Sequence, residues 1–269
     1  MNTGVIKLSH FSVKEYLLST SAHEYFIIDE KTSHSEMTQL SITYLLQFDD
    51  DSLPLTKAIS MPLAGYAAEY WIDHAKSGGM DPTVLQLILH LFTSGSAPII
   101  NWIRLYNIDG GDFGEHVNLS MDRARVCSAL YYSSLAGMEE VLDCLLDKGE
   151  NANAKGGTYG NALQAASFRG NEAVVKLLLD NGAQVNAEGG KYGNALQAAS
   201  DRGNEAIVKL LLDNGAEVNA EGGRFGNALQ AASFGDNEAI VKLLLDNGAQ
   251  VNAEGGEYGN ALQASLAKE

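Results

Sequence analysis

The residues best able to do chemistry in this 269-residue chain are glycines placed just before alanine-rich runs. In E-G-G-K-Y-G-N-A-L-Q-A-A-S, residues 188–200, three glycines precede such a run. Glycines there let backbone N–H groups close around a phosphate at the positive end of a helix. A P-loop also needs G-x-x-x-x-G-K-[ST], which the chain lacks, and a dinucleotide fingerprint must follow a strand, whereas a helix and turn precede this loop. An NTPase is therefore a remote alternative.

The other reactive side chains show no catalytic or metal-binding pattern. The six histidines all lie before residue 117 and lack a metal-ligand spacing such as H-E-x-x-H. Asp73 and His74 are adjacent, and neighbours on a helix point in different directions, so they form no dyad. Cys127 and Cys144 are expected to be buried, reduced thiols because no ligand cluster accompanies them. We predict no enzyme, no metal and no cofactor. The histidines are His10, His23, His34, His74, His90 and His116.

The glycine loop belongs to an internal repeat. The word N-A-L-Q begins at Asn161, Asn194, Asn227 and Asn260, each 33 residues after the one before. A fixed period of this length indicates a solenoid, in which each unit buries its apolar face against its neighbours. The glycines then form the loop that connects one repeat to the next, rather than a phosphate site.

One repeat, residues 192–224, predicts two helices and an extended loop. Asn194 can cap a short, alanine-rich helix, and Gln197 can reach back to complete the N-x-x-Q form of the capping box. A second helix is expected over about 205–213, with its apolar surface supplied by Ile207, Val208, Leu210, Leu211 and Leu212. Asn214 and Gly215 then end it.

This pattern resembles the ankyrin repeat, whose G-H-L-E-V-V-K-L-L-L-x-x-G-A-D-V-N-A half is echoed by G-N-E-A-I-V-K-L-L-L-D-N-G-A-E-V-N-A. In place of that family's T-P-L-H the chain has N-A-L-Q, so Asn and Gln substitute for its Thr and His pair. The first unit, from Ser128, replaces the alanine-rich helix with one that carries Leu130, Tyr131 and Tyr132, which suits packing against the preceding domain or a cap. The last unit stops after its first helix, so we expect an exposed apolar end face.

Some of the differences between the repeats fall at positions that the family displays on its concave face. Residues 159–191 and 192–224 differ at four positions, two of which are Phe168 against Asp201 and Lys191 against Arg224. Unconstrained drift at exposed positions is the alternative explanation, but aromatic residues are enriched in binding hot spots, so we expect Phe168 and Phe234 to be exposed anchors for a protein partner. The predicted partner-binding residues are, at the loop tips, Thr158, Lys191, Arg224 and Glu257 and, between the helices, Phe168, Arg169, Asp201, Arg202, Phe234 and Gly235.

The first 120 residues lack the period and are expected to form a separate helical domain. S-x-x-E boxes at Ser12–Glu15, with a Phe11–Tyr16 staple, and at Ser33–Glu36 predict two helix starts. The second box should open a helix with Met37, Leu40, Tyr44 and Leu45 on one face. Further helices are expected from about Pro62, with Leu63, Tyr66, Ala67, Tyr70 and Trp71 on one face and a stop at Gly78–Gly79, from Asp81–Pro82, and over 99–106. Residues 107–120 are the predicted linker, and 121–269 the repeats.

A second resemblance covers residues 4–106. The segments V-I-K-L-S-H-F-S-V-K-E-Y-L-L-S and P-L-A-G-Y-A-A-E-Y-W-I-D-H-A look like the region that follows the nucleotide-binding module in fungal NACHT proteins, NLR-like sensors whose carboxyl-terminal arms are often ankyrin arrays. V-I-K-L-S-H reads as a strand, as in a remnant winged-helix or helical segment. The family's P-loop is not in this sequence.

Composition excludes several partner classes. The formal charge is −16, and the acidic excess divides evenly between residues 1–121 and 122–269. Nucleic acid and anionic membranes need clustered Lys and Arg, so neither is an expected partner. The chain contains no run of 18 apolar residues, the length needed to span a bilayer, and its amino terminus has no secretory pattern. A cytoplasmic location is therefore expected.

Together these observations predict an all-α protein, a helical domain followed by an ankyrin array, that binds another protein through the concave face of the repeats. The favoured interpretation is the recognition and relay arm of an NLR-like sensor, without its nucleotide-binding domain. The alternative is a free-standing ankyrin adaptor or decoy.

Overall fold

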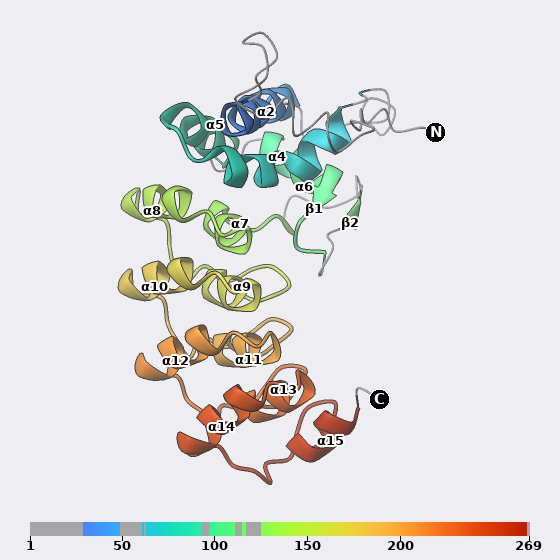
Figure 1. Cartoon of the computed structure of the whole chain (residues 1–269), viewed down its shortest axis with the longest axis vertical. Coiled ribbons are helices and arrows are strands. Elements are labelled where there is room, and N and C mark those ends of the chain that lie inside the picture. Colours follow the sequence, from blue (N-terminus) through green and yellow to red (C-terminus); the bar gives the residue numbers. More distant parts are fainter. Residues whose placement is uncertain are drawn as a thin grey trace, which may run out of the picture.

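The computed structural model describes residues 29–48, 61, 63–92, 97–110, 115–116 and 125–267. Within these residues the chain is mostly helical with almost no strand, and its elements stack along one long axis from the N-terminal helices to α15 (Figure 1). The all-α fold class is therefore confirmed. The Ser12–Glu15 box, the Phe11–Tyr16 staple and the V-I-K-L-S-H strand lie outside the described residues.

The N-terminal helices pack around large aromatic side chains. They are α2 (Glu30–Leu45), α4 (Ala64–Gly78), α5 (Pro82–Phe92) and α6 (Ala97–Leu105). Trp71 and Trp102 are fully buried, with ring centroids 5.2 Å apart, and both lie close to the ring of Phe92. The Trp102 indole donates a 2.9 Å hydrogen bond to the Ala68 carbonyl, which satisfies its N–H inside the core.

The start of α2 was wrongly predicted. The helix begins three residues before Ser33, and its cap is Asp29, whose carboxylate accepts from the Thr32 backbone N–H at 3.2 Å. Because Asp29 already offers the capping acceptor, Ser33 lies inside the helix and its N–H bonds to the Asp29 carbonyl at 2.9 Å. Leu40, expected on the apolar face, is 66% exposed.

The buried face of α4 also differs from the prediction. The helix ends at Gly78, next to Gly79, as expected, but Leu63 and Tyr70 are 59% and 40% exposed. The helix buries Ala68 and Ile72 in addition to the predicted Ala67 and Trp71. Small residues let α2 approach it closely, since a Cβ on Gly78 would lie 2.4 Å from the Ser35 backbone nitrogen.

The segment predicted as a linker contains paired backbone. Strand β1 (Tyr106–Asn107) pairs antiparallel with β2 (Glu115–His116), so that Tyr106 lies opposite His116. The turn after β1, residues 108–110, packs against the repeats rather than only connecting them, as described below. Glycine content alone could not reveal this pairing.

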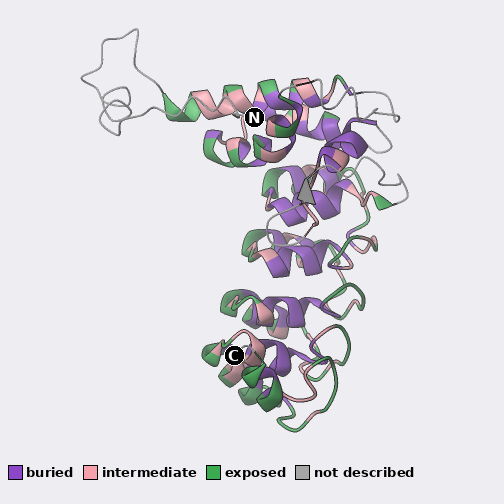
Figure 2. Ribbon diagram, turned by 90° about the vertical axis from the view of Figure 1, so that its right-hand side faces the viewer, coloured by how far each residue is buried: buried purple, intermediate pink, exposed green. Residues whose placement is uncertain are grey.

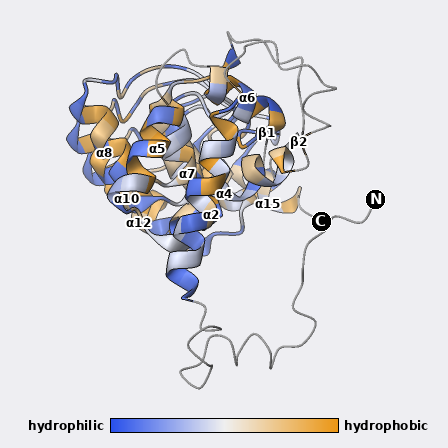
Figure 3. Cartoon of the chain, turned by 90° about the horizontal axis from the view of Figure 1, so that it is seen from above, coloured by the Kyte–Doolittle hydropathy of each residue, from blue (hydrophilic) through white to orange (hydrophobic). Residues whose placement is uncertain are grey.

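The repeats form two columns of helices. Short inner helices alternate with outer helices along the axis, and viewed down the stack the outer helices α8, α10 and α12 lie on one side (Figures 1 and 3). The inner helices are α7 (Ala129–Ala136), α9 (Ala162–Arg169), α11 (Ala195–Asp201), α13 (Ala228–Phe234) and α15 (Ala261–Leu266). The outer helices are α8 (Glu139–Asp147), α10 (Glu172–Asp180), α12 (Glu205–Asp213) and α14 (Glu238–Asp246).

The asparagine caps are present as predicted, but the reach-back predicted for Gln197 is not formed, because its buried amide oxygen has no hydrogen-bond partner. Asn194 accepts from the Gln197 backbone N–H at 2.9 Å, as expected. The reciprocal capping box is complete in α13, where the Gln230 amide oxygen accepts from the Asn227 N–H. Gln230 also donates to carbonyls of the following loop, and Gln197 donates to Ala220 at 3.2 Å. The Gln197–Ala220 bond lies within residues 192–224, whereas the bond from Gln230 to Gly259 joins consecutive repeats.

One hydrophobic core runs through the whole stack, and buried residues follow the inner helices from end to end (Figure 2). The bulky first repeat packs against α6, as expected, because the Tyr132 ring lies 5.7 Å from that of Trp102. At the other end, Leu262 and Leu266 of α15 are 71% and 61% exposed. No single helix among the described residues has the length and apolar character to cross a membrane.

Candidate functional site

The glycine loops are where one repeat touches the next. A Cβ on Gly223 would lie 2.2 Å from the Tyr192 carbonyl carbon, and the residue's φ is +61°. Gly190 and Gly256 make the same approach to the preceding repeat. Only glycine tolerates both the positive φ and the contact with backbone. The loops therefore serve packing between repeats, as the repeat interpretation predicted.

The predicted loop-tip residues form a continuous hydrogen-bonded column. The Lys191 N–H donates to the Thr158 carbonyl, the Arg224 N–H to the Lys191 carbonyl and the Glu257 N–H to the Arg224 carbonyl, each at 2.9 Å. These four residues, called here the loop-tip column, are thus held one above another. Their side chains are the variable part of an otherwise fixed backbone arrangement.

A ladder of stacked aromatic rings follows directly behind this column. Successive centroids of Tyr159, Tyr192, Phe225 and Tyr258 are 6.1, 5.9 and 5.8 Å apart, and the rings are close to parallel. Each ring belongs to the residue that follows a loop-tip residue. The ladder gives the loop tips a rigid apolar support.

The expectation that Phe168 and Phe234 are exposed was wrong. Phe168 is only 4% exposed, because its ring inserts beside the ladder, 4.4 Å from Tyr159 and 5.1 Å from Tyr192. Phe234 is half-buried and sits likewise beside Phe225 and Tyr258. A ring at this position loses its exposure by stacking on its neighbours. Phe168 is therefore a buried packing residue under the exposed surface of the repeats.

Asp201 occupies the same position in the middle repeat, where no ring is inserted. Its half-buried carboxylate accepts a hydrogen bond from the Tyr192 hydroxyl. Burial raises the pKa of Asp201, and that hydrogen bond and the nearby cations lower it again in part. The interacting cations are Arg202, Arg224 and Lys191.

These cations lie over aromatic rings. The Arg202 guanidinium carbon is 4.6 Å from the Phe168 ring centroid, and the Lys191 ammonium is 5.6 Å from that of Tyr192. Arg224 lies within 5.4–5.5 Å of three ring centroids, belonging to Phe225, Phe234 and Tyr258. Arg224 also forms an ion pair of 2.9 Å with Glu257 and donates to the Tyr258 hydroxyl. The structure therefore brings the loop tips and the inter-helix positions together on one face, called here the cation–aromatic face.

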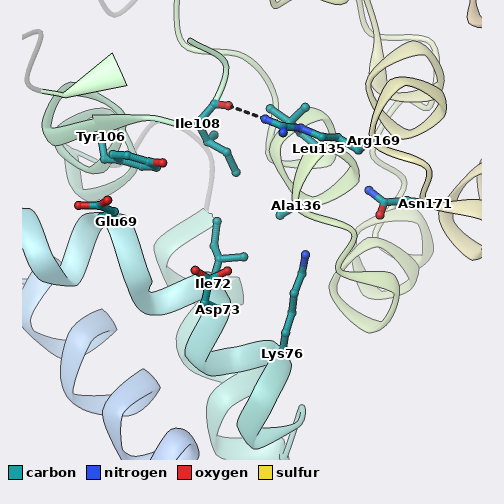
Figure 4. A pocket seen from close by; sticks show the side chains of 10 residues that line it. All are labelled: Glu69, Ile72, Asp73, Lys76, Tyr106, Ile108, Leu135, Ala136, Arg169 and Asn171. Carbon is teal, nitrogen blue, oxygen red and sulfur yellow. Dashed lines mark hydrogen bonds between the residues drawn. The ribbon is translucent and has the colours of Figure 1, made fainter. Parts of the chain in front are cut away.

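Thr158 and Arg169 belong to the junction with the N-terminal helices. The Asp109 carboxylate accepts from the Thr158 N–H at 2.8 Å and from the Tyr131 hydroxyl at 2.5 Å. Arg169 donates to the Ile108 carbonyl at 3.3 Å (Figure 4). Burial raises the pKa of Asp109, and these hydrogen bonds offset part of that rise. Asp109 was missed because it lies in the predicted linker, where no pattern pointed to a structural carboxylate.

The turn after α13, which contains Gly235, differs from the turns after α9 and α11. In earlier repeats a glycine follows the arginine, whereas here Gly235 precedes Asp236, which itself takes the positive φ of 59°. This turn therefore has Gly235 in place of Arg169 and Arg202, and the acidic Asp236 in place of Gly170 and Gly203.

A cavity of about 380 Å³ lies between α4 and the first two repeats (Figure 4). Glu69, Asp73 and Lys76 line it from α4, and Arg169 reaches it from α9. Burial lowers the pKa of Lys76; Asp73 opposes that shift and Arg169 reinforces it. A second cavity of about 460 Å³ lies on the loop side of Asp109, next to Cys127 and Thr158. Both cavities adjoin the junction.

Two of the histidines make a contact that the sequence did not predict. His34 and His74 meet across α2 and α4, with Nδ1 atoms 2.7 Å apart, and the Tyr66 hydroxyl lies 2.7 Å from His74 Nε2. Spacing in the sequence could not reveal a pair separated by 40 residues. Burial raises the pKa of Cys127 to about 11, so its thiol stays protonated at neutral pH. Among the described residues, no group of three or more His, Cys, Asp or Glu is placed to hold a metal ion.

Comparison with known proteins identifies a protein family and a relative. A family model described as ankyrin repeats (3 copies) matches residues 88–189 and 188–255. The chain is also similar to the azaphilone pigments biosynthesis cluster protein L of Monascus ruber, at 38% identity over 178 residues. That match covers 60% of this chain and 37% of the relative, so the chain spans well under half of the relative's length.

Proposed function

We propose that this chain, which belongs to the ankyrin-repeat family, is a protein-binding module whose partner contacts the cation–aromatic face. The observation that carries this proposal is where nearly identical repeats differ. Two of the differing positions lie on that face, although they are far apart within the repeat. One holds Phe168 or Asp201, and the other holds Lys191 or Arg224. Because a fold alone does not define a function, the argument depends on this face.

The chemistry of the face supports a protein partner. Arginine and aromatic side chains are the types enriched in binding hot spots. Arg202 and Lys191 are exposed, and Phe234 is half-buried beside Arg224, so a partner could reach a polar rim over an apolar base. We place the primary contact at these residues, with Phe168 acting as their support.

We further propose that the chain serves as the recognition and relay arm of an NLR-like sensor in the cytoplasm, without catalysis and without nucleic acid or membrane as partner. The resemblance of residues 4–106 to the region that follows the nucleotide-binding module of fungal NACHT proteins supports this role. The net charge of −16 disfavours nucleic acid and anionic membranes as partners. Asp109 and Arg169 supply a physical route for relay, since both bond across the junction. A free-standing adaptor or decoy is the alternative.

Selection of a displayed peptide library against the intact chain tests the binding function. Enriched ligands should lose affinity for Arg202→Ala and Phe234→Ala while keeping it for Lys209→Ala, on the outer face of α12. Enriched ligands that bind all three variants equally would place the site elsewhere, and failure to enrich any ligand would remove the support for a peptide-binding face.

The sensor role has its own test. Sequencing the transcript upstream of the Met1 codon should reveal an open frame encoding G-x-x-x-x-G-K-[ST]. An in-frame stop would favour the adaptor. Calorimetry of this chain with ATP or GTP should show no micromolar binding, and a positive result would restore the NTPase alternative.

A further inference from the structure

We propose that the segment bound by this face is acidic and extended, and that its carboxylates bind Lys191, Arg202 and Arg224 around Asp201. This inference rests on the proposed binding function and specifies the chemistry of the partner. It commits to a protein segment rich in Asp or Glu rather than to an apolar helix.

Charge is the first argument. The chain as a whole carries −16, yet three cations gather here with the two carboxylates of Asp201 and Glu257. Arg169, beside Phe168, extends the basic surface toward the junction. A locally basic face on an acidic molecule attracts acidic segments and repels basic ones, so it selects partners by charge.

The cations are also held in place before any ligand arrives. Arg202 lies 4.6 Å from the centroid of the Phe168 ring, and Arg224 lies beside three rings. A guanidinium stacked on a ring presents N–H groups at its edge to a carboxylate, and Arg224 already binds the exposed Glu257 carboxylate in this way, at 2.9 Å. Because part of the side-chain entropy is already lost, binding a carboxylate costs less than at a free arginine. The buried Phe168 thereby contributes to recognition without touching the partner.

The spacing of the rings in the aromatic ladder matches that of side chains in an extended bound segment. The aromatic ladder advances by 5.8–6.1 Å per repeat, and the loop-tip column advances with it through backbone hydrogen bonds. In an extended strand, side chains on one face are about 6.6 Å apart. A segment lying along the column therefore presents alternate side chains to consecutive repeats, and Lys191 and Arg224 fall on neighbouring steps.

Asp201 marks the centre of the site. It replaces the phenylalanine found at positions 168 and 234, so a carboxylate rather than a third ring lies beside the stacked rings of Tyr192 and Phe225. Its carboxylate interacts with all three cations and partly neutralises them. Asp201 therefore limits affinity for an acidic ligand, and its removal should strengthen binding.

Fluorescence anisotropy with defined peptides tests this inference on the intact chain. The probe is a labelled peptide in which glutamate alternates with serine, and the comparison peptides carry glutamine or lysine instead. Two or three partly exposed ion pairs predict that the glutamate peptide binds about tenfold more tightly than the glutamine peptide, less so at high salt. The lysine peptide should not bind.

Matched charge reversals locate the effect. Lys191→Glu with Arg202→Glu should reduce affinity for the glutamate peptide at least about tenfold, since each attraction becomes a repulsion. Lys176→Glu with Lys209→Glu makes the same charge change on the exposed side of the outer helices and should leave affinity within about twofold, since screening weakens distant charges. Asp201→Asn should tighten binding several-fold.

Two outcomes overturn the inference: equal binding of the glutamate and glutamine peptides, or equal losses from both pairs of reversals. If library selection returns non-acidic ligands that still depend on Arg202 and Phe234, the binding function stands and only the acidic specificity fails. If selection yields ligands indifferent to those residues, the binding face itself is refuted.

Discussion

The carboxylate of Asp109 accepts a 2.5 Å hydrogen bond from the hydroxyl of Tyr131. Asp109 lies in the turn after β1 and Tyr131 in the first helix of the array, so this bond fastens the N-terminal helices to the repeats. The same carboxylate accepts from the Thr158 N–H, at the start of the loop-tip column. The junction and the proposed binding face therefore share one side chain.

Replacing Asp109 should weaken this connection. Because a largely buried hydroxyl and an N–H lose their acceptor, Asp109→Ala should lower the free energy of unfolding by about 1–3 kcal/mol. Urea denaturation of Asp109→Ala, Tyr131→Phe and the double variant measures the coupling. Strict additivity of the two single changes would show that the bond contributes nothing. Asp180→Ala, at the exposed end of α10, serves as the control.

The glycine loops predict a position-specific cost. Gly223→Ala meets both a positive φ and backbone at 2.2 Å, whereas Gly182→Ala meets a positive φ of 80° in open space. Gly182→Ala should cost about 1–2 kcal/mol from backbone strain alone. Gly223→Ala should cost several times more, because a repeat must shift. Thermal unfolding of the two variants measures both costs. Equal losses of stability would mean that the close approach of Gly223 to the preceding repeat is unimportant.

Adding a ring beside the aromatic ladder at position 201 should stabilise the array. Asp201→Phe removes a half-buried carboxylate and restores the ring present at positions 168 and 234. An added aromatic contact is worth about 0.5–1.5 kcal/mol, so the melting temperature should rise. The reverse change, Phe168→Asp, should lower it. A fall in stability for Asp201→Phe would show that Asp201 holds its cations for stability rather than for binding.

The pair of histidines predicts acid sensitivity. The pKa of His74 lies below its ordinary value of 6.5, first because burial disfavours the imidazolium and then because His34 is near; Asp73 opposes both. Since the unfolded chain then binds protons more readily, stability should fall as pH drops through 6.5 toward the folded value. NMR titration should place the His74 pKa below 6.5, and His34→Gln should raise it. An unchanged value would refute the coupling.

Much of the repeat architecture could be predicted from the sequence, because short-range signals determine it. The N-A-L-Q words located the helix caps, and the predicted outer helix over 205–213 coincides with α12. The N-terminal helices were predicted less well. Asp29 rather than Ser33 caps α2, since two competing caps within one turn look equivalent in sequence.

The site was less predictable because it depends on contacts between distant residues. Sequence comparison found the variable positions but could not show that Phe168 stacks against Tyr159 and is buried. Nor could it place Asp109 beneath Thr158, 49 residues away. Exposure at a repeat position depends on whether a neighbouring ring covers it, and this is decided only when the repeats stack.

The most direct test of the central claim is hydrogen exchange of the intact chain with and without a ligand enriched from the peptide library. If the partner binds the cation–aromatic face, exchange should slow at residues 191–193 and 224–226 and around the turns 169–171 and 202–204, while α10, α12 and α14 remain unchanged. Slowing confined to those outer helices, with the loop-tip column unaffected, would contradict the proposed binding face.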